Sequence, residues 1–224
     1  MKKIAQAVMV AACLMGAGAA HAQLGGLGSL LSAAKGGSTG GDIGADVKTF
    51  VTQSAALSAL TGRSVIAIKS AFDSAEQRAK TKAELDDIEK LTDAKERDAR
   101  RAKLVESSAA EAKRLYDSGE MKTRMSSLDD ASRKQVGNAL LNYGIGALQA
   151  AALTKTGQSL IAKASANPMS IPQVLPVKDS LPLLGKVVSD SGGLIAGVIK
   201  LAQGAKIDVQ SPKAESKPVE LDII

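Results

Sequence analysis

The sequence predicts an all-α fold: a helical bundle with a long charged helix or helical hairpin arm packed on two apolar helical segments. Two observations favour this class. Apolar residues recur at intervals of three and four over long stretches, which is the period of one helix face. Aromatic residues make up only 2% of the chain, so the core must be built from Ala, Leu, Ile and Val, whereas a β-sandwich would need more aromatic and β-branched side chains. A hydrophobic content of 45% is enough for one globular domain.

The first 22 residues contain the three parts of a secretory signal peptide in the right order. Lys2 and Lys3 supply positive charge, residues 4–19 are apolar or small, and residues 20–22 read Ala-His-Ala, the small-x-small pattern that signal peptidase recognises. The apolar run is shorter than the roughly 20 residues that a spanning helix needs. We therefore expect cleavage after about Ala22 and a mature protein in the bacterial periplasm or outside the cell.

Cleavage at this point removes the chain's single Cys and single His, Cys13 and His21. The mature protein then has no disulfide to stabilise it, and loss of the two signal-peptide lysines lowers its net charge from +6 to +4. An alternative is that Cys13 is lipidated and retained, because residues 10–13 loosely resemble a lipobox. The apolar run before it would be very short, so simple cleavage is favoured.

Residues 23–44 are rich in Gly and Ser, which predicts a flexible leader before a single helical domain at residues 45–209. We expect an amphipathic helix from residue 45 to residue 72, with Gly62 as a point where it can bend. Its apolar positions follow three/four spacing: Val47, Phe50, Leu57, Leu60, Val65, Ile68 and Phe72.

Residues 73–118 are densely charged with both signs interspersed, and one thin apolar stripe runs along them. The end of this stripe is the candidate partner-contact seam: Ala102, Val105, Ala109, Ala112 and Tyr116. Lys95 and Asp98 interrupt the stripe upstream, so a solvated helix packed on a neighbour is favoured over a protruding coiled-coil hairpin that grips a partner. Gly119 is expected to end this helix in the left-handed conformation.

A helix from residue 128 to about residue 166 follows, with a cap and first-turn carboxylates within residues 127–130. Its segment 136–153 carries no charge and is rich in Gly and Ala, which would let another helix approach closely. All six prolines come after this helix, so residues 167–177 are expected to form an extended connection.

The last helix is expected to be capped by Asp179 or Ser180, with Pro182 in its first turn. Residues 189–193 (Ser-Asp-Ser-Gly-Gly) should break or kink that helix before it resumes. Residues 210–224 contain two prolines and alternating charges, which predicts a loose C-terminal tail.

The mature chain lacks the residues of most catalytic sites. Without His and Cys it cannot build a Ser-His-Asp or Cys-His site, a Cys/His zinc site or a His-ligated haem, so we expect no catalytic residue, cofactor or metal. Ser32 and Lys35 match the Ser-x-x-Lys pattern of penicillin-binding enzymes, and residues 155–157 match their Lys-Thr-Gly. The expected Ser-Asp-Asn is absent, however, and Ser32 lies in the leader.

These observations favour a non-enzymatic helical interaction or scaffold protein of the bacterial periplasm, including a chaperone-like role, that binds a protein partner in the cell envelope. The alternative is a protein that engages lipid or a membrane through the apolar segments 136–153 and 183–201. Nucleic acid is not expected as a partner, because aromatic stacking faces are scarce. A buried core hairpin is favoured for the two apolar segments, since Asn142 and Gln149 argue against insertion of the first.

Overall fold

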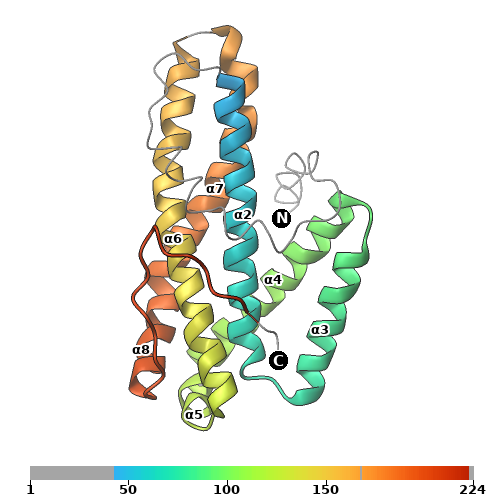
Figure 1. The fold of residues 1–224 in the computed structure, drawn as a ribbon, viewed down its shortest axis with the longest axis vertical. Coiled ribbons are helices and arrows are strands. Elements are labelled where there is room, and N and C mark those ends of the chain that lie inside the picture. The colour runs from blue at the N-terminus through green and yellow to red at the C-terminus, as the bar shows by residue number, and fades with distance from the viewer. Residues whose placement is uncertain (1–42, 167, 222–224) are drawn as a thin grey trace.

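The computed structural model describes residues 43–166 and 168–221, and it confirms the all-α bundle (Figure 1). Every regular element within these residues is helical. In chain order the elements are α2 (Ile43–Ser70), α3 (Ala75–Lys90), α4 (Ala94–Asp117), α5 (Glu120–Ser126), α6 (Asp130–Ser165), the 3₁₀ helix η2 (Pro168–Val174), α7 (Leu175–Asp190), the π-helix η3 (Ser191–Ile195) and α8 (Ala196–Gly204). The predicted signal peptide and nearly all of the predicted leader lie outside the described residues.

Two long helices, α2 and α6, lie side by side along most of the molecule and form its spine (Figure 1). α7 packs on both of them, while α4 packs on α2. We call the half that holds η2 and the start of α7 the upper half, and the half that holds α5 and α8 the lower half, as they are oriented in Figure 1.

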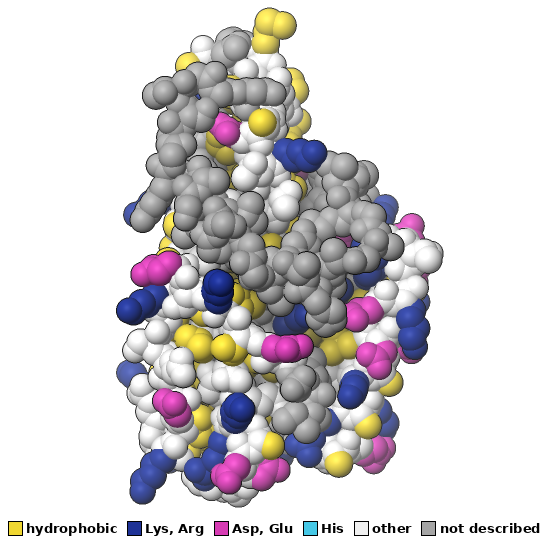
Figure 2. Space-filling view, viewed as in Figure 1, with side chains coloured by type: hydrophobic (Ala, Val, Ile, Leu, Met, Phe, Trp, Pro, Cys, Tyr) yellow, Lys and Arg dark blue, Asp and Glu magenta, His cyan; other side chains and the backbone are white. Residues whose placement is uncertain are grey.

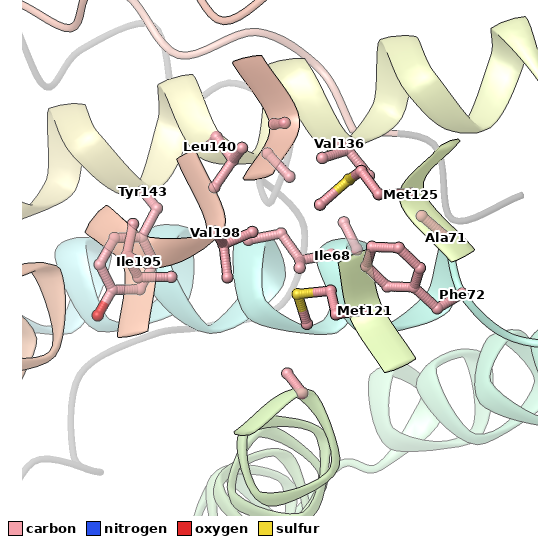
Figure 3. Close-up of a cluster of buried hydrophobic side chains, with 14 of the residues drawn as sticks. Ile68, Ala71, Phe72, Met121, Met125, Val136, Leu140, Tyr143, Ile195 and Val198 are labelled. Carbon is pink, nitrogen blue, oxygen red and sulfur yellow. The ribbon is translucent and has the colours of Figure 1, made fainter. Parts of the chain in front are cut away.

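The lower core lies where α2, α4, α5, α6 and α8 meet (Figure 3). Met121 of the short helix α5 points toward Ile68 and Phe72, and Met125 points toward Val136. Both methionines are fully buried, as suits flexible side chains that fill irregular gaps. The complete set is Ala67, Ile68, Ala71, Phe72, Ala112, Leu115, Met121, Met125, Val136, Ala139, Leu140, Tyr143, Ala147, Ile195, Val198, Ala202 and Ile207.

The upper core lies between α2, α6, η2 and α7, and Phe50 is its single aromatic side chain. Gly157 of α6 makes room for it, because a Cβ there would lie 2.8 Å from the Phe50 ring and 2.9 Å from Leu181 of α7. Within the segment 136–153, for which the sequence predicts a close approach of another helix, a Cβ on Gly146 would lie 2.6 Å from Thr61 of α2. The buried members are Val47, Phe50, Leu57, Ala150, Leu153, Leu160, Ala164, Val174, Val177 and Leu184.

The charged region folds as a hairpin of α3 and α4, one of the two predicted forms. Ser74 starts α3 with a capping box: its hydroxyl accepts from the Gln77 N–H (3.2 Å), and the Gln77 side chain accepts from the Ser74 N–H (3.0 Å). Asp93 starts α4 by accepting from the Glu96 N–H at 2.7 Å. These two caps separate the charged stretch into helices that can turn back on one another.

The next helix ends lie close to the predicted positions, but α6 begins at Asp130, two residues after the predicted start at Leu128. Gly119 has φ of 77°, the left-handed conformation expected after the charged helix. The Asp129 carboxylate accepts from the Ser132 N–H at 2.7 Å and caps α6, and this backbone hydrogen bond lowers the pKa of Asp129. α6 then continues to Ser165, within one residue of the predicted end.

The extended connection predicted at residues 167–177 is wrong, because η2 is a 3₁₀ helix and α7 begins at Leu175. Asp179 and Ser180 are therefore not caps, and Pro182 lies inside α7. The reason is burial: Val174, Val177 and Leu184 enter the upper core at helical spacing. The predicted interruption near residues 189–193 is confirmed as the π-turn of η3 between α7 and α8.

The C-terminal segment, residues 207–221, is non-helical, but it differs from the loose tail that the sequence predicts. The side chain of Asn142 on α6 holds the backbone of Val219 at both polar groups: its amide donates to the Val219 oxygen (2.7 Å), and its oxygen accepts from the Val219 N–H (2.8 Å). Two turns further along the same face of α6, Gln149 donates to the Ala214 oxygen at 2.7 Å.

Two glycines of α6 lie beneath this segment. A Cβ on Gly144 would lie 2.6 Å from the Pro212 ring, and a Cβ on Gly137 would collide with the backbone oxygen of Asp208. On this face, the small residues of α6 admit an extended segment of the chain instead of another helix.

Candidate functional site

The most unusual surface of the described chain is an exposed apolar cluster in the upper half, which we call the apolar end. Met169 and Ile171 of η2 are 87% and 42% exposed, and Leu175 and Leu183 of α7 are 52% and 51% exposed. Figure 2 shows hydrophobic side chains at the upper tip of the molecule, where Figure 1 places η2 and the start of α7. Large apolar side chains gathered in this way are typical of interaction surfaces.

The local sequence explains why these side chains point outward. Val174, Val177 and Leu184 occupy the face of η2 and α7 that enters the upper core, so the opposite face must meet solvent. In most surface helices that opposite face is polar, whereas here it carries Leu175 and Leu183. The exposed side of α7 therefore carries two leucines beside the charged residues Lys178, Asp179 and Lys186.

One stretch of the described chain, Met169–Gly204, is long and apolar enough to cross a membrane by length and composition alone. Its most apolar window is only 18% buried, whereas the core helix of a soluble protein is mostly buried. The segment 136–153, which the sequence pairs with it as a lipid-contact candidate, lies in α6 and is largely buried in the two cores. Each of the two predicted segments has one exposed large apolar side chain, Leu148 in 136–153 and Leu183 in 183–201.

Four lysines belong to the helices that carry or adjoin the apolar end. Lys163 lies in the last turn of α6 and Lys178 in the first turn of α7, on either side of η2 in the chain. Lys48 of α2 and Lys155 of α6 belong to the same half of the molecule. Among the residues that the structure describes, none of these four lysines forms an ion pair.

Two aspartates, Asp46 and Asp179, accompany these four lysines in residues 43–60 and 146–184, which leaves the upper half with a net charge of +2. Within the described residues, no salt bridge neutralises this positive charge. A surface that complements the apolar end would offer apolar groups to the exposed side chains and negative charges to the lysines.

The candidate seam on α4 makes contacts within the bundle. Val105 packs against α2, where a Cβ on Gly62 would lie 2.8 Å from it. Ala112 is buried in the lower core, and Tyr116 packs beside Gly197 of α8. The other two positions of the seam differ: Ala109 is half-buried and Ala102 is exposed.

The buried face of α4 is displaced by about one position from the predicted seam, at Leu104, Ser108, Ala112 and Leu115. The two leucines bury more apolar surface than the alanines and so set the orientation of the helix. Gly62 lies inside the continuous helix α2, where it admits Val105.

The other polar features of the structure have structural roles. A cavity of about 320 Å³ opens beside α6 and is lined by Arg133, Lys134 and Lys206, among others. The Arg133 guanidinium is committed to backbone oxygens there, donating to Leu128 (3.0 Å) and Ala205 (3.3 Å). Within the described residues, no three His, Cys, Asp or Glu side chains gather closely enough to hold a metal ion.

Tyr143 is buried in the lower core, where burial raises the pKa of its hydroxyl. Its hydroxyl donates to the Val187 oxygen at 3.4 Å, a contact that ties α6 to α7. This hydrogen bond can fix the position of α6 relative to α7, and the tyrosine hydroxyl lies away from solvent.

Sequence reasoning missed Met169, Ile171 and Leu175 because they fall in the predicted extended connection. A usable signal was present: apolar residues recur between the prolines of residues 168–177, where a solvated linker would carry polar ones.

The chain matches no family model, no curated protein and no solved structure.

Proposed function

We propose that this chain is an exported, non-enzymatic interaction protein of the bacterial cell envelope and that the apolar end is its binding surface. The observation that carries the proposal is the exposure of Met169, Ile171, Leu175 and Leu183 at one end of an otherwise well-packed bundle. Leaving such side chains in water forgoes roughly 25 cal/mol for each Å² of apolar surface that could be buried. A partner that covers them recovers this free energy.

The sequence supports the non-enzymatic part of the proposal. If cleavage occurs after Ala22, the mature chain contains neither thiol nor imidazole. Three polar side chains that the bundle buries help to hold it together: Asn142 and Gln149 bind the C-terminal segment, and Gln135 donates to the Ala67 oxygen of α2 (3.2 Å). A scaffold or chaperone-like binder needs a contact surface, and no reacting group.

A photo-crosslinking amino acid at position 175 tests the binding surface in living cells. We expect irradiation to give adducts with envelope components at position 175 but not at position 158, an exposed polar site of α6 in the same half. Absence of adducts at 175, or equal adducts at both positions, would overturn the proposal.

The export part is tested by N-terminal sequencing of the protein recovered from the periplasm or medium. A start at Gln23 is expected. A start at Cys13 would instead indicate lipidation, and recovery of the uncleaved chain from the cytoplasm would contradict export.

A further inference from the structure

We propose that the partner of the apolar end is the surface of an anionic lipid bilayer. This inference rests on the proposed function and names its partner. Met169, Ile171 and Leu175 enter the boundary between headgroups and acyl chains, while Lys163 and Lys178 contact the negatively charged headgroups.

The first argument is the arrangement of the apolar side chains. η2 and the start of α7, which carry them, lie at the upper tip of the bundle in Figure 1, and Figure 2 shows hydrophobic side chains at that tip. Two cavities of the described chain lie in the lower half, beside Asn138 of α6 and beside Phe72. A protruding apolar tip fits a deformable surface better than it fits a protein groove.

The second argument is charge. Lys163 in the last turn of α6 and Lys178 in the first turn of α7 flank η2 in the chain, and neither forms an ion pair within the described residues. The upper half carries a net charge of +2. Cations beside exposed apolar side chains are the recurring feature of proteins that lie on anionic membranes.

The third argument concerns depth. Val174, Val177 and Leu184 hold the inner face of this helix in the upper core, so inserting the whole stretch across a bilayer would empty that core. Asp179 and the Lys186–Asp190 ion pair would also have to enter the hydrocarbon. Docking at the surface keeps the bundle intact, and spanning does not.

Flotation of the secreted protein with lipid vesicles tests this inference. We expect binding to phosphatidylcholine vesicles that contain phosphatidylglycerol and at least about tenfold weaker binding to phosphatidylcholine alone. Binding should weaken with added salt, because screening reduces the attraction between lysines and headgroups.

Three variants locate the contact. Ile171→Ser/Leu175→Ser should weaken binding to the anionic vesicles by about tenfold or more, because each side chain loses apolar contact with the lipid. Lys163→Gln/Lys178→Gln should weaken it by about tenfold while leaving the apolar side chains in place. Leu148→Ser, at a leucine of α6 that is 43% exposed but lies outside the apolar end, is the matched control and should change binding by less than about twofold.

Circular dichroism of each variant confirms that the bundle remains folded. Failure of the folded protein to float with anionic vesicles would overturn the lipid inference, as would an equal loss on Leu148→Ser. If crosslinks at position 175 then go to a protein, the proposed function stands and only its lipid partner is wrong. If position 175 gives no adduct at all, both fail.

Discussion

The upper and lower halves of the bundle are stabilised differently. The upper half consists of three helices around an apolar core with one aromatic side chain, Phe50, and its tip stays apolar on the outside. The lower half brings together helices from five parts of the chain, and all described ion pairs except Lys186–Asp190 lie between Arg63 and Arg124.

The two halves differ in how many elements of the chain cover the spine helices α2 and α6. In the lower half, α4, α5, α8 and the C-terminal segment surround α2 and α6, so apolar faces find partners within the chain. Among the described residues of the upper half, α7 and η2 are the elements that cover α2 and α6, and Met169, Ile171, Leu175 and Leu183 stay exposed there.

The largest effect is expected from Phe50→Ala in the upper core. Phe50 is 1% exposed and fills the space above Gly157, so its removal should lower the free energy of unfolding by about 3–5 kcal/mol. Urea denaturation measures this loss. A loss below about 1 kcal/mol would show that the upper half does not depend on this one side chain.

A smaller loss, about 1–3 kcal/mol, is expected from Gly197→Ala in the lower half. The new Cβ would lie 2.5 Å from the Tyr116 ring carbon that bears the hydroxyl, so the tyrosine must move. In a Tyr116→Ala background the same change should cost nothing, and it should stabilise α8 by up to about 1 kcal/mol because Ala favours a helix more than Gly does. Additive effects in the double variant would contradict this contact.

The C-terminal segment adds to the stability of the lower half. Asn142→Ala removes both hydrogen bonds to Val219 and should lower the free energy of unfolding by about 1–2 kcal/mol. Hydrogen exchange in residues 207–221 should quicken more than exchange in α2. Asn138→Ala, a change of the same chemistry at a half-buried position one turn away, is the control and should leave that exchange unaltered.

The smallest effect is expected from Arg114→Gln, because its ion pairs are exposed to solvent. The Arg114 guanidinium hydrogen-bonds Glu111 and Glu120 and holds the pKa of both carboxyls below the usual range. A lowered pKa in the folded state contributes stability above the unfolded value, roughly 4.3, and that stability is lost as the pH falls through the folded value.

Thermal unfolding of the wild type should therefore show a steeper loss of stability below about pH 4.3 than the variant shows. At pH 7 in high salt the two proteins should differ least, since salt screens exposed charges. If the wild type and the variant lose stability equally as the pH falls, these ion pairs contribute nothing to the stability of the folded state.

Much of the fold follows from local patterns. The left-handed Gly119 and the interruption after Asp190 were accessible from residue type and spacing, because each depends on atoms within a few residues. The start of α6 was predicted within two residues for the same reason. The capping signal at Asp93 was equally local, but the surrounding charges concealed it within one apparent helix.

The start of α7 depends on contacts with other helices, so the residues of its own segment do not predict it. Prolines at 168, 172 and 176 locally disfavour a helix, yet Pro176 lies in the first turn of α7, where a proline removes no needed hydrogen bond. Burial of Val177 against helices more than ten residues away decided the outcome. The candidate site depends on this segment, so Met169, Ile171 and Leu175 could not be placed from the sequence.

The docked C-terminal segment has a consequence for the order in which the protein folds. Asn142 and Val219 are separated by 77 residues, so their pairing joins segments that are far apart in the chain. During synthesis, Gly137 and Gly144 stay uncovered until residues 208–212 have been made. This face of α6 is therefore covered only after all the helices of the described bundle have been made.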